Sequence, residues 1–250
     1  MTLRSTLAVA VALALPGLPS VAHPEHRHSG GISTAAVSQV VPAFDIVHTK
    51  IRAEGRHAVF HIAVSGQAGA VKPTPSGKLG GSSVFSYVWP TTLDPAVVGF
   101  EPKAGILAFA VTAHPDFDDT PLFDENGDGD PGNDGNVWHS HWVVLQPDRA
   151  CGPDALKVVD IPAGTTPRLP KTWPGLPILI DSPGWAPRFS KETLEVRVPF
   201  DDIGAVQSAR FDGVTAALRV NASVHSPLLC VVDVFKVASG TLSLPGHVGR

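Results

Sequence analysis

Glycine and proline interrupt this chain so often that few segments are long enough to form a helix. The sequence has 24 glycines and 24 prolines in 250 residues, and runs of β-branched and aromatic residues recur between them. Short runs of this kind, bounded by turn-forming residues, are typical of β-strands. The pattern therefore predicts an all-β fold, namely an antiparallel β-sandwich with long loops rich in Pro, Gly and Asp.

The N-terminal segment has the pattern of a secretory signal peptide. Arg4 provides a basic start, an apolar run follows over 7–15, and small residues end the segment at 20–22. We expect residues 1–22 to be removed and the product to lie in the periplasm, to be secreted or to sit at the cell surface. We expect residues 23–38 to form a mobile arm and 39–250 to form a single β-sandwich domain. No later run approaches the ~20 apolar residues of a transmembrane segment.

Composition limits both partners and chemistry. A formal net charge of −4 with 19 basic residues offers no concentrated positive field, so nucleic acid is not an expected partner. Cys151 and Cys230 are the only cysteines, and in an oxidising compartment we expect them to form a disulfide. The single methionine is Met1, so a transition metal would depend on His nitrogen and Asp or Glu oxygen, as copper(II) and zinc do.

The segment 44–64 predicts a β-hairpin. Apolar residues alternate with polar ones on both sides of a turn at Glu54-Gly55, and they share a face only if paired positions sum to an odd number. A turn centred on Glu54-Gly55 gives a sum of 109 and places His48 directly opposite His61. Directly opposed residues have Cβ atoms ~5 Å apart, close enough for two imidazoles to hold one metal ion.

Further strands are expected between the turn signals. The run at 105–114 is almost entirely apolar and is therefore expected to be central in its sheet. The other expected strands lie at 84–89, 136–145, 193–200, 213–224 and 228–237.

The acidic segment before residue 136 resembles the calcium loop of EF-hand proteins. Asp124, Asn126 and Asp128 occupy the first, third and fifth positions of a D-x-N-x-D-G string, and Gly129 stands where that loop turns sharply. Position twelve departs from the family, because Gly135 replaces the bidentate glutamate. The resemblance implies a structural calcium ion without an EF-hand fold. Its expected ligands come from Asp124, Asn126, Asp128, Asp130 and Asp134.

A solvated acidic turn is the alternative interpretation of this segment, since Asp, Asn and Gly are common turn formers. However, eight acidic residues lie between 116 and 134, and so many carboxylates repel one another unless a cation neutralises them. Asp116, Asp118 or Asp119 are alternative sources of the missing carboxylate.

Histidines provide the candidate transition-metal ligands. Strand periodicity puts His139 and His141 on one face and Trp138, Ser140 and Trp142 on the other. A His-x-His pair presents two imidazoles to one ion, although a strand with histidines on its outer face would have the same pattern. The candidate ligands are His23, His48, His61, His114, His139 and His141.

The arm contains His23, His26 and His28 and has two interpretations of its own. As a mobile tail it would bind metals with low specificity. As a fixed N-terminus, His23 resembles the copper-chelating histidine of lytic polysaccharide monooxygenases. That resemblance implies a copper-dependent oxidative enzyme.

Two wider resemblances concern the whole chain. The hairpin opening, the acidic loop between core strands and the late LEVRVPFDDIG segment resemble extracellular β-sandwich modules of the DOMON and carbohydrate-binding type. Trp138, His139 and His141 beside the 124–134 loop make the chain similar to secreted copper-binding proteins of methane-oxidising bacteria. The tryptophan spacing differs, so no tryptophan role is carried over.

These observations predict an exported protein that binds copper, or zinc, through histidines for metal acquisition, storage or delivery. A small ligand or a membrane-bound metal-handling protein is a further possible partner. The alternative is a periplasmic ligand- or carbohydrate-binding module, in which loop tryptophans (Trp89, Trp173 and Trp185) stack on a sugar or apolar ligand or else cap the core. The sequence lacks G-x-S-x-G and H-E-x-x-H motifs, which disfavours an enzyme.

Overall fold

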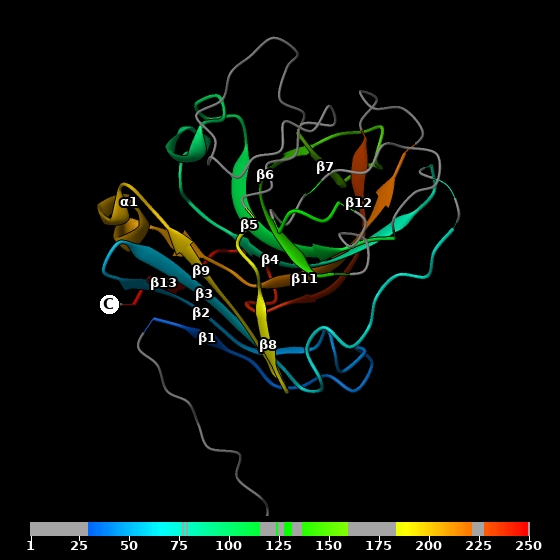
Figure 1. Cartoon of the computed structure of the whole chain (residues 1–250), viewed down its shortest axis with the longest axis horizontal. Helices are drawn as coiled ribbons and strands as arrows, with labels where there is room; N and C mark the ends of the chain where they lie inside the picture. The colour runs from blue at the N-terminus through cyan, green and yellow to red at the C-terminus, as the bar shows by residue number, and fades with distance from the viewer. Residues whose placement is uncertain are drawn as a thin grey trace, which may run out of the picture.

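The computed structural model describes residues 30–76, 78, 80–115, 124, 128–131, 137–159, 184–221 and 228–249. Its strands are all antiparallel in the paired registers, and they form one open sheet, a closed barrel and a small two-stranded ribbon. The expected all-β fold is therefore confirmed, and one layer of the sandwich is closed into a barrel (Figure 1).

The open sheet has five strands in the order β1-β2-β3-β9-β8. These strands are β1 (Ile32–Ser33), β2 (Ile46–Glu54), β3 (His57–Val64), β8 (Arg188–Ser190) and β9 (Thr193–Pro199). The barrel has the order β11-β12-β7-β6-β5-β4. Its strands are β4 (Ser83–Pro90), β5 (Ile106–Ala113), β6 (His139–Pro147), β7 (Leu156–Val158), β11 (Val214–Val220) and β12 (Leu229–Val237).

Three short elements complete the described part. The ribbon pairs β10 (Arg210–Phe211) with β13 (Gly246–His247), and the helical turns are η1 (Pro95–Val98) and α1 (Ile203–Ser208). Asp94 and Asp202 begin η1 and α1 by accepting hydrogen bonds from backbone amides. Among the described helices, none is long and apolar enough to cross a membrane.

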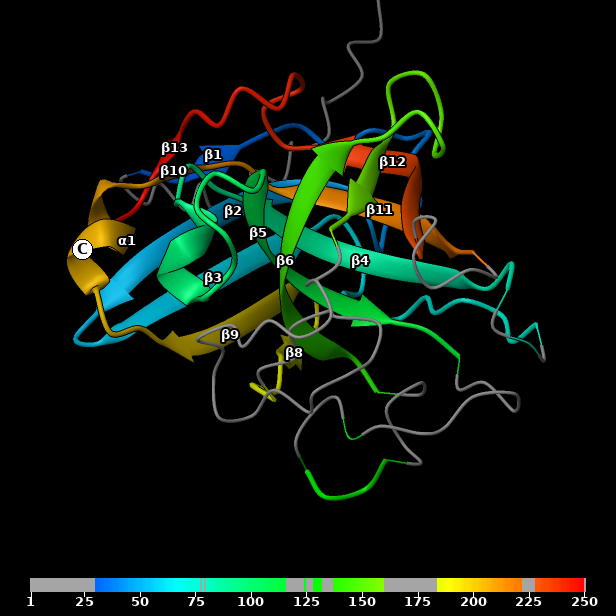
Figure 2. The ribbon, with the colours of Figure 1, turned by 90° about the horizontal axis from the view of Figure 1, so that it is seen from above.

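The barrel strands β4, β5 and β6 bury both of their faces. Along β5, Leu107, Phe109 and Val111 belong to the core against the open sheet, whereas Ala108 and Ala110 belong to the core inside the barrel. Figure 2 shows the open sheet beside this part of the barrel. Two buried faces require apolar side chains at successive positions, which explains why the run at 105–113 is apolar except at Thr112 and confirms its central position.

Aromatic side chains fill the core between the two layers. The rings of Phe60 and Phe109 are stacked with centroids 4.5 Å apart, and Trp142 meets Phe109 edge-on at 5.0 Å. Trp89 and Trp142 are both fully buried there. Trp89 therefore lies in a core strand, and the expectation that it stands in a loop is wrong.

The β2–β3 hairpin has the expected facing parity but a different register. Ile51 pairs with Phe60 and Glu54 with His57, so paired positions sum to 111 rather than 109. The turn is centred one residue later than expected because Gly55 adopts the left-handed conformation (φ +61°) that a tight turn requires. His48 consequently lies opposite Ala63, and His61 lies opposite Lys50, so the predicted direct His48–His61 pair is wrong.

The sheet begins earlier than the sequence suggested. Ile32 and Ser33 pair with Thr49 and His48 of β2, so this part of the expected 23–38 arm belongs to the open sheet. Residues 1–29, which include the expected signal peptide and His23, lie outside the described residues.

A buried ion pair joins the N-terminal segment to the barrel. Lys236 Nζ of β12 lies 2.8 Å from Asp45 Oδ1 and donates to the carbonyl oxygen of Ala35 at 2.9 Å. Burial disfavours the charged form of Asp45. The hydrogen bonds from Lys236 and from the N–H of Val37 outweigh that effect, so the pKa of Asp45 lies below its ordinary value.

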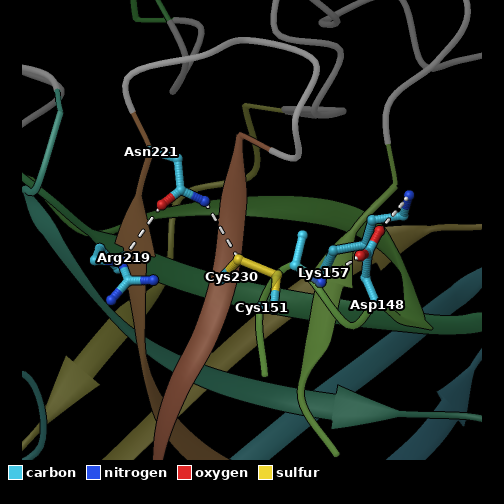
Figure 3. The surroundings of a disulfide bond; sticks show 7 residues. Asp148, Cys151, Lys157, Arg219, Asn221 and Cys230 are labelled. Carbon is cyan, nitrogen blue, oxygen red and sulfur yellow. Dashed lines mark hydrogen bonds and ion pairs between the residues drawn. A yellow bond between two sulfur atoms is a disulfide. The ribbon is translucent and has the colours of Figure 1, made fainter. Parts of the chain in front are cut away.

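The barrel closes at a seam between β7 and β12, where backbone pairing is sparse and where the disulfide lies. In the described registers, β7 pairs with β12 at one position, Lys157 with Cys230. The Cys151–Cys230 disulfide, with Cα atoms 5.3 Å apart, crosses this seam (Figure 3) and confirms the expected bridge. An ion pair between Lys157 and Asp148 at 3.0 Å lies beside it. The covalent bond therefore supplies closure where backbone pairing supplies little.

Removing the disulfide is expected to destabilise the barrel. The two cysteines are 79 positions apart. Loss of a bridge that closes a loop of this length should lower the free energy of unfolding by about 2–5 kcal/mol in a Cys151→Ser/Cys230→Ser variant. Urea unfolding followed by tryptophan fluorescence measures this, with reduced wild-type protein as the control. An unchanged free energy would show that strand pairing alone closes the seam.

The Asp45–Lys236 pair predicts a defined pH dependence. Because the folded pKa of Asp45 is lowered, its stabilisation is fully present above its ordinary pKa of 3.8 and is lost as pH falls through the folded value. Above pH 3.8, Asp45→Asn should be less stable than wild type, and the difference should shrink at lower pH. Free energies of unfolding at pH 3 to 7 test this. A difference that stays constant with pH would contradict it.

Candidate functional site

Strand β6 places its two histidines inside the barrel. His139 is completely buried and His141 is 4% exposed, while Trp138 and Trp142 belong to the core on the opposite face. The two rings lie on the same side of the strand, as expected, with centroids 4.7 Å apart. The alternative of an outer, solvated histidine face is wrong because β6 is buried on both sides.

A third histidine joins this pair from the neighbouring strand. Thr112 of β5 pairs with His139, so His114, just beyond the end of β5, lies beside the start of β6. The centroids of the His114 and His139 rings are 5.0 Å apart. His114, His139 and His141 thus form one group, called here the histidine cluster.

Local contacts define how these rings are held. The Nδ1 atoms of His139 and His114 lie 3.0 and 3.1 Å from the carbonyl oxygens of Val137 and Pro115. A carbonyl only accepts, so in both rings Nδ1 is the donor, and in the neutral form of such a ring Nε2 carries the lone pair that binds metals. His141 Nε2 lies 2.9 Å from Thr112 Oγ1, so its hydrogen bond to that hydroxyl occupies one ring nitrogen.

The cluster has the donor chemistry of a metal site without the converged geometry of one. Two imidazoles on one ion, with metal–nitrogen bonds of ~2 Å, bring their ring centres to roughly 5 Å, which matches the observed spacings. Within the described ranges, however, no group of three or more His, Cys, Asp or Glu side chains is arranged to hold an ion. Binding by all three rings therefore requires them to reorient, and His141 is tied to Thr112 as they stand.

The other predicted histidine pair lies elsewhere, on the open sheet. The rings of His48 and His61 lie diagonally across β2 and β3 with centroids 5.8 Å apart. His61 Nδ1 is 3.9 Å from Glu195 Oε2, and Arg52 binds the same carboxylate at 3.1 Å. This pair therefore belongs to a polar network across β2, β3 and β9 and is not part of the histidine cluster.

The described part of the acidic segment has a compact turn around Asp124. Its carboxylate accepts hydrogen bonds from the N–H groups of Asp128 at 3.0 Å and Gly129 at 2.9 Å, and Asp128 accepts from the N–H of Asp130 at 2.9 Å. Gly129 has a positive φ of +92°, as the sharp turn at this position requires. Asn126 and Asp134 lie outside the described residues, so only part of the expected ligand set is placed.

The barrel interior contains a cavity that local sequence patterns do not predict. Its volume is about 160 Å³, and aliphatic side chains from all six barrel strands line it. Thr112, His114, His141 and Ser86 contribute the polar part of its wall. Apolar residues alternate along β4 and β11 and face a common interior, but alternation alone does not indicate that the sheet closes into a barrel.

The tryptophans expected to stack on a sugar are not all available. Trp89 is buried in the core, and Trp185 packs against the same core with its ring centre 6.5 Å from that of Phe109. Trp173 lies outside the described residues. These positions favour the core-capping interpretation for Trp185 over the carbohydrate-stacking one.

Comparison with known proteins does not assign this chain to a family. No protein-family model, no curated protein and no solved structure matches this chain. The resemblances to calcium loops and to exported β-sandwich or copper-binding proteins therefore remain interpretations of short segments.

The calcium interpretation predicts a measurable change in stability. If an ion neutralises the acidic segment, chelation should lower the melting temperature of the wild-type protein by several degrees. Asp124→Ala/Asp128→Ala should show the lower value with and without chelator. Differential scanning calorimetry with calcium or EDTA tests this, with Asp154→Ala/Asp233→Ala, which removes two exposed aspartates elsewhere, as the control. A melting temperature independent of calcium in the wild-type protein would contradict the interpretation.

Proposed function

We propose that this protein binds a transition metal ion, with copper favoured over zinc, through the histidine cluster. The observation that supports this most strongly is the gathering of His114, His139 and His141 inside the barrel with ring centres 5.0 and 4.7 Å apart. Imidazole is a strong ligand for both metals, and at a nitrogen site copper(II) binds more tightly than zinc.

Burial of these imidazole rings carries a desolvation cost, which contacts within the protein or with a bound ion must offset. Polar rings taken out of water lose hydration, and two of these three are nearly or fully buried. The contacts to Val137, Pro115 and Thr112 satisfy one nitrogen of each ring and fix its orientation. Such backbone and hydroxyl contacts are the usual outer partners of metal-binding histidines, because they set the tautomer that presents a lone pair.

The proposed role is acquisition, storage or delivery of the metal outside the cytoplasm. The signal-like N-terminus and the disulfide are consistent with an oxidising compartment, where copper(II) persists. A calcium ion in the 124–134 segment would have a structural role, because this segment leads into β6 and would fix the approach to His139.

Metal analysis of matched variants tests the proposal. The protein is exported to a bacterial periplasm, purified without a histidine tag and compared with His139→Ala/His141→Ala. The control is His57→Ala/His247→Ala, which also removes two histidines but takes them from outside the cluster. We expect about one equivalent of copper or zinc in the wild type and the control, and loss of at least tenfold in affinity in the cluster variant.

The alternative outcomes have distinct meanings. Metal retained by His139→Ala/His141→Ala but lost from His48→Ala/His61→Ala would move the site to the open sheet and contradict the proposal. Electron paramagnetic resonance of the copper(II) form of the wild type reports the nitrogen ligands directly, so the test does not depend on the variants folding. Absence of nitrogen coupling would also contradict the proposal.

A further inference from the structure

We infer that the barrel interior is a second binding site, for a neutral ring-sized apolar molecule that carries one hydrogen-bonding group. This inference goes beyond metal binding and does not depend on it. The relevant cavity has a volume of about 160 Å³ and lies within the closed barrel. A cavity of roughly 150 Å³ with apolar walls stays dry and binds benzene in an engineered protein, so the size matches a single substituted ring.

Small side chains create this space. Ala110 of β5 and Ala216 of β11 both face the interior, where larger aliphatic residues would fill a barrel of this strand number. The surrounding walls are mainly Val and Leu from β4, β6, β7, β11 and β12. These apolar side chains cannot hydrogen-bond to water inside the cavity, which favours an apolar occupant.

The polar part of the wall limits what the occupant can carry. Ser86 Oγ donates to the carbonyl oxygen of Ala216 at 3.0 Å, and Thr112 Oγ1 lies 2.9 Å from His141 Nε2. Thr112 retains further hydrogen-bonding capacity, because a hydroxyl both donates and accepts. Among the described residues that line the cavity there is no Lys, Arg, Asp or Glu, so a charged ligand would lack a permanently charged partner among them.

The cavity reaches the protein surface beside β12. Val234 and Leu242 line it, yet they are 49% and 36% exposed. These residues mark an apolar rim through which a small molecule can enter. The described registers of β11 with β12 shift twice, which is where this wall bends.

Toluene and two para-substituted toluenes test the polarity of the site. Toluene, p-cresol and p-toluate share a ring and a methyl group. Toluene carries no polar group, p-cresol carries a hydroxyl, and p-toluate carries a charged carboxylate. Isothermal titration is carried out with EDTA present, so that metal at His141 does not contribute. We expect toluene to bind, p-cresol to bind about fivefold more tightly through one hydrogen bond, and p-toluate to bind at least tenfold more weakly than p-cresol.

Two variants locate the binding. Ala216→Leu fills the cavity and should abolish toluene binding, whereas Ala36→Leu makes the same change at an exposed position and should leave it intact. Thr112→Val should keep toluene binding but remove the preference for p-cresol. If Ala216→Leu does not fold, Leu218→Ala replaces it, because an enlarged cavity should bind 1-naphthol more tightly than the wild type does.

Each negative result contradicts a different part of the inference. No binding of toluene or p-cresol to the wild type overturns the inference. Equal binding of toluene and p-cresol, or tighter binding of p-toluate, overturns the assignment of a neutral ligand with one polar group. The titrations use metal-free protein that retains all its histidines, so the result for ring binding does not depend on the result for copper, and the two proposals fail independently.

Discussion

The double burial of strands β4, β5 and β6 is the constraint on which the rest of this structure depends. One face of these strands forms the aromatic core with the open sheet, and the other forms the aliphatic lining of the barrel. Neither face is available to water, so every side chain along β5 must be apolar or satisfied by a neighbour. The buried polar residues on the barrel face of these strands include Ser86, Thr112, His139 and His141, and each needs a hydrogen-bonding partner.

Closure of the barrel depends on β12, which pairs extensively with β11 but only slightly with β7. Strands β11 and β12 pair along their whole lengths, whereas β7 contributes three residues and meets β12 at one described position. The disulfide crosses that seam near the start of β12, and the Asp45–Lys236 ion pair joins the other end of β12 to the N-terminal segment. Two specific interactions thus fix a strand in which Val232 and Val234 are 46% and 49% exposed.

The two proposed sites share one wall and meet at His141. This residue belongs to the histidine cluster through His139 and also lines the cavity, where it contacts Thr112. A reorientation of its ring toward a metal ion would change the hydrogen bonding offered to a molecule in the cavity. Any thermodynamic coupling between the two ligands would act through this hydrogen bond and would be reciprocal.

Local sequence determined much of the architecture. Turn residues and alternating runs indicated the strands, the run at 105–114 indicated a central one, and the two cysteines indicated the bridge, because these signals depend on neighbours along the chain. The shared face of His139 and His141 followed from strand periodicity alone. Only the tertiary structure decided that this face points into a closed barrel, that His114 joins it while His48 and His61 do not, and that alanines leave a cavity. Register and closure arise from contacts between residues far apart in the chain, where one displaced turn at Gly55 shifts every pair and periodicity carries no information about what lies opposite.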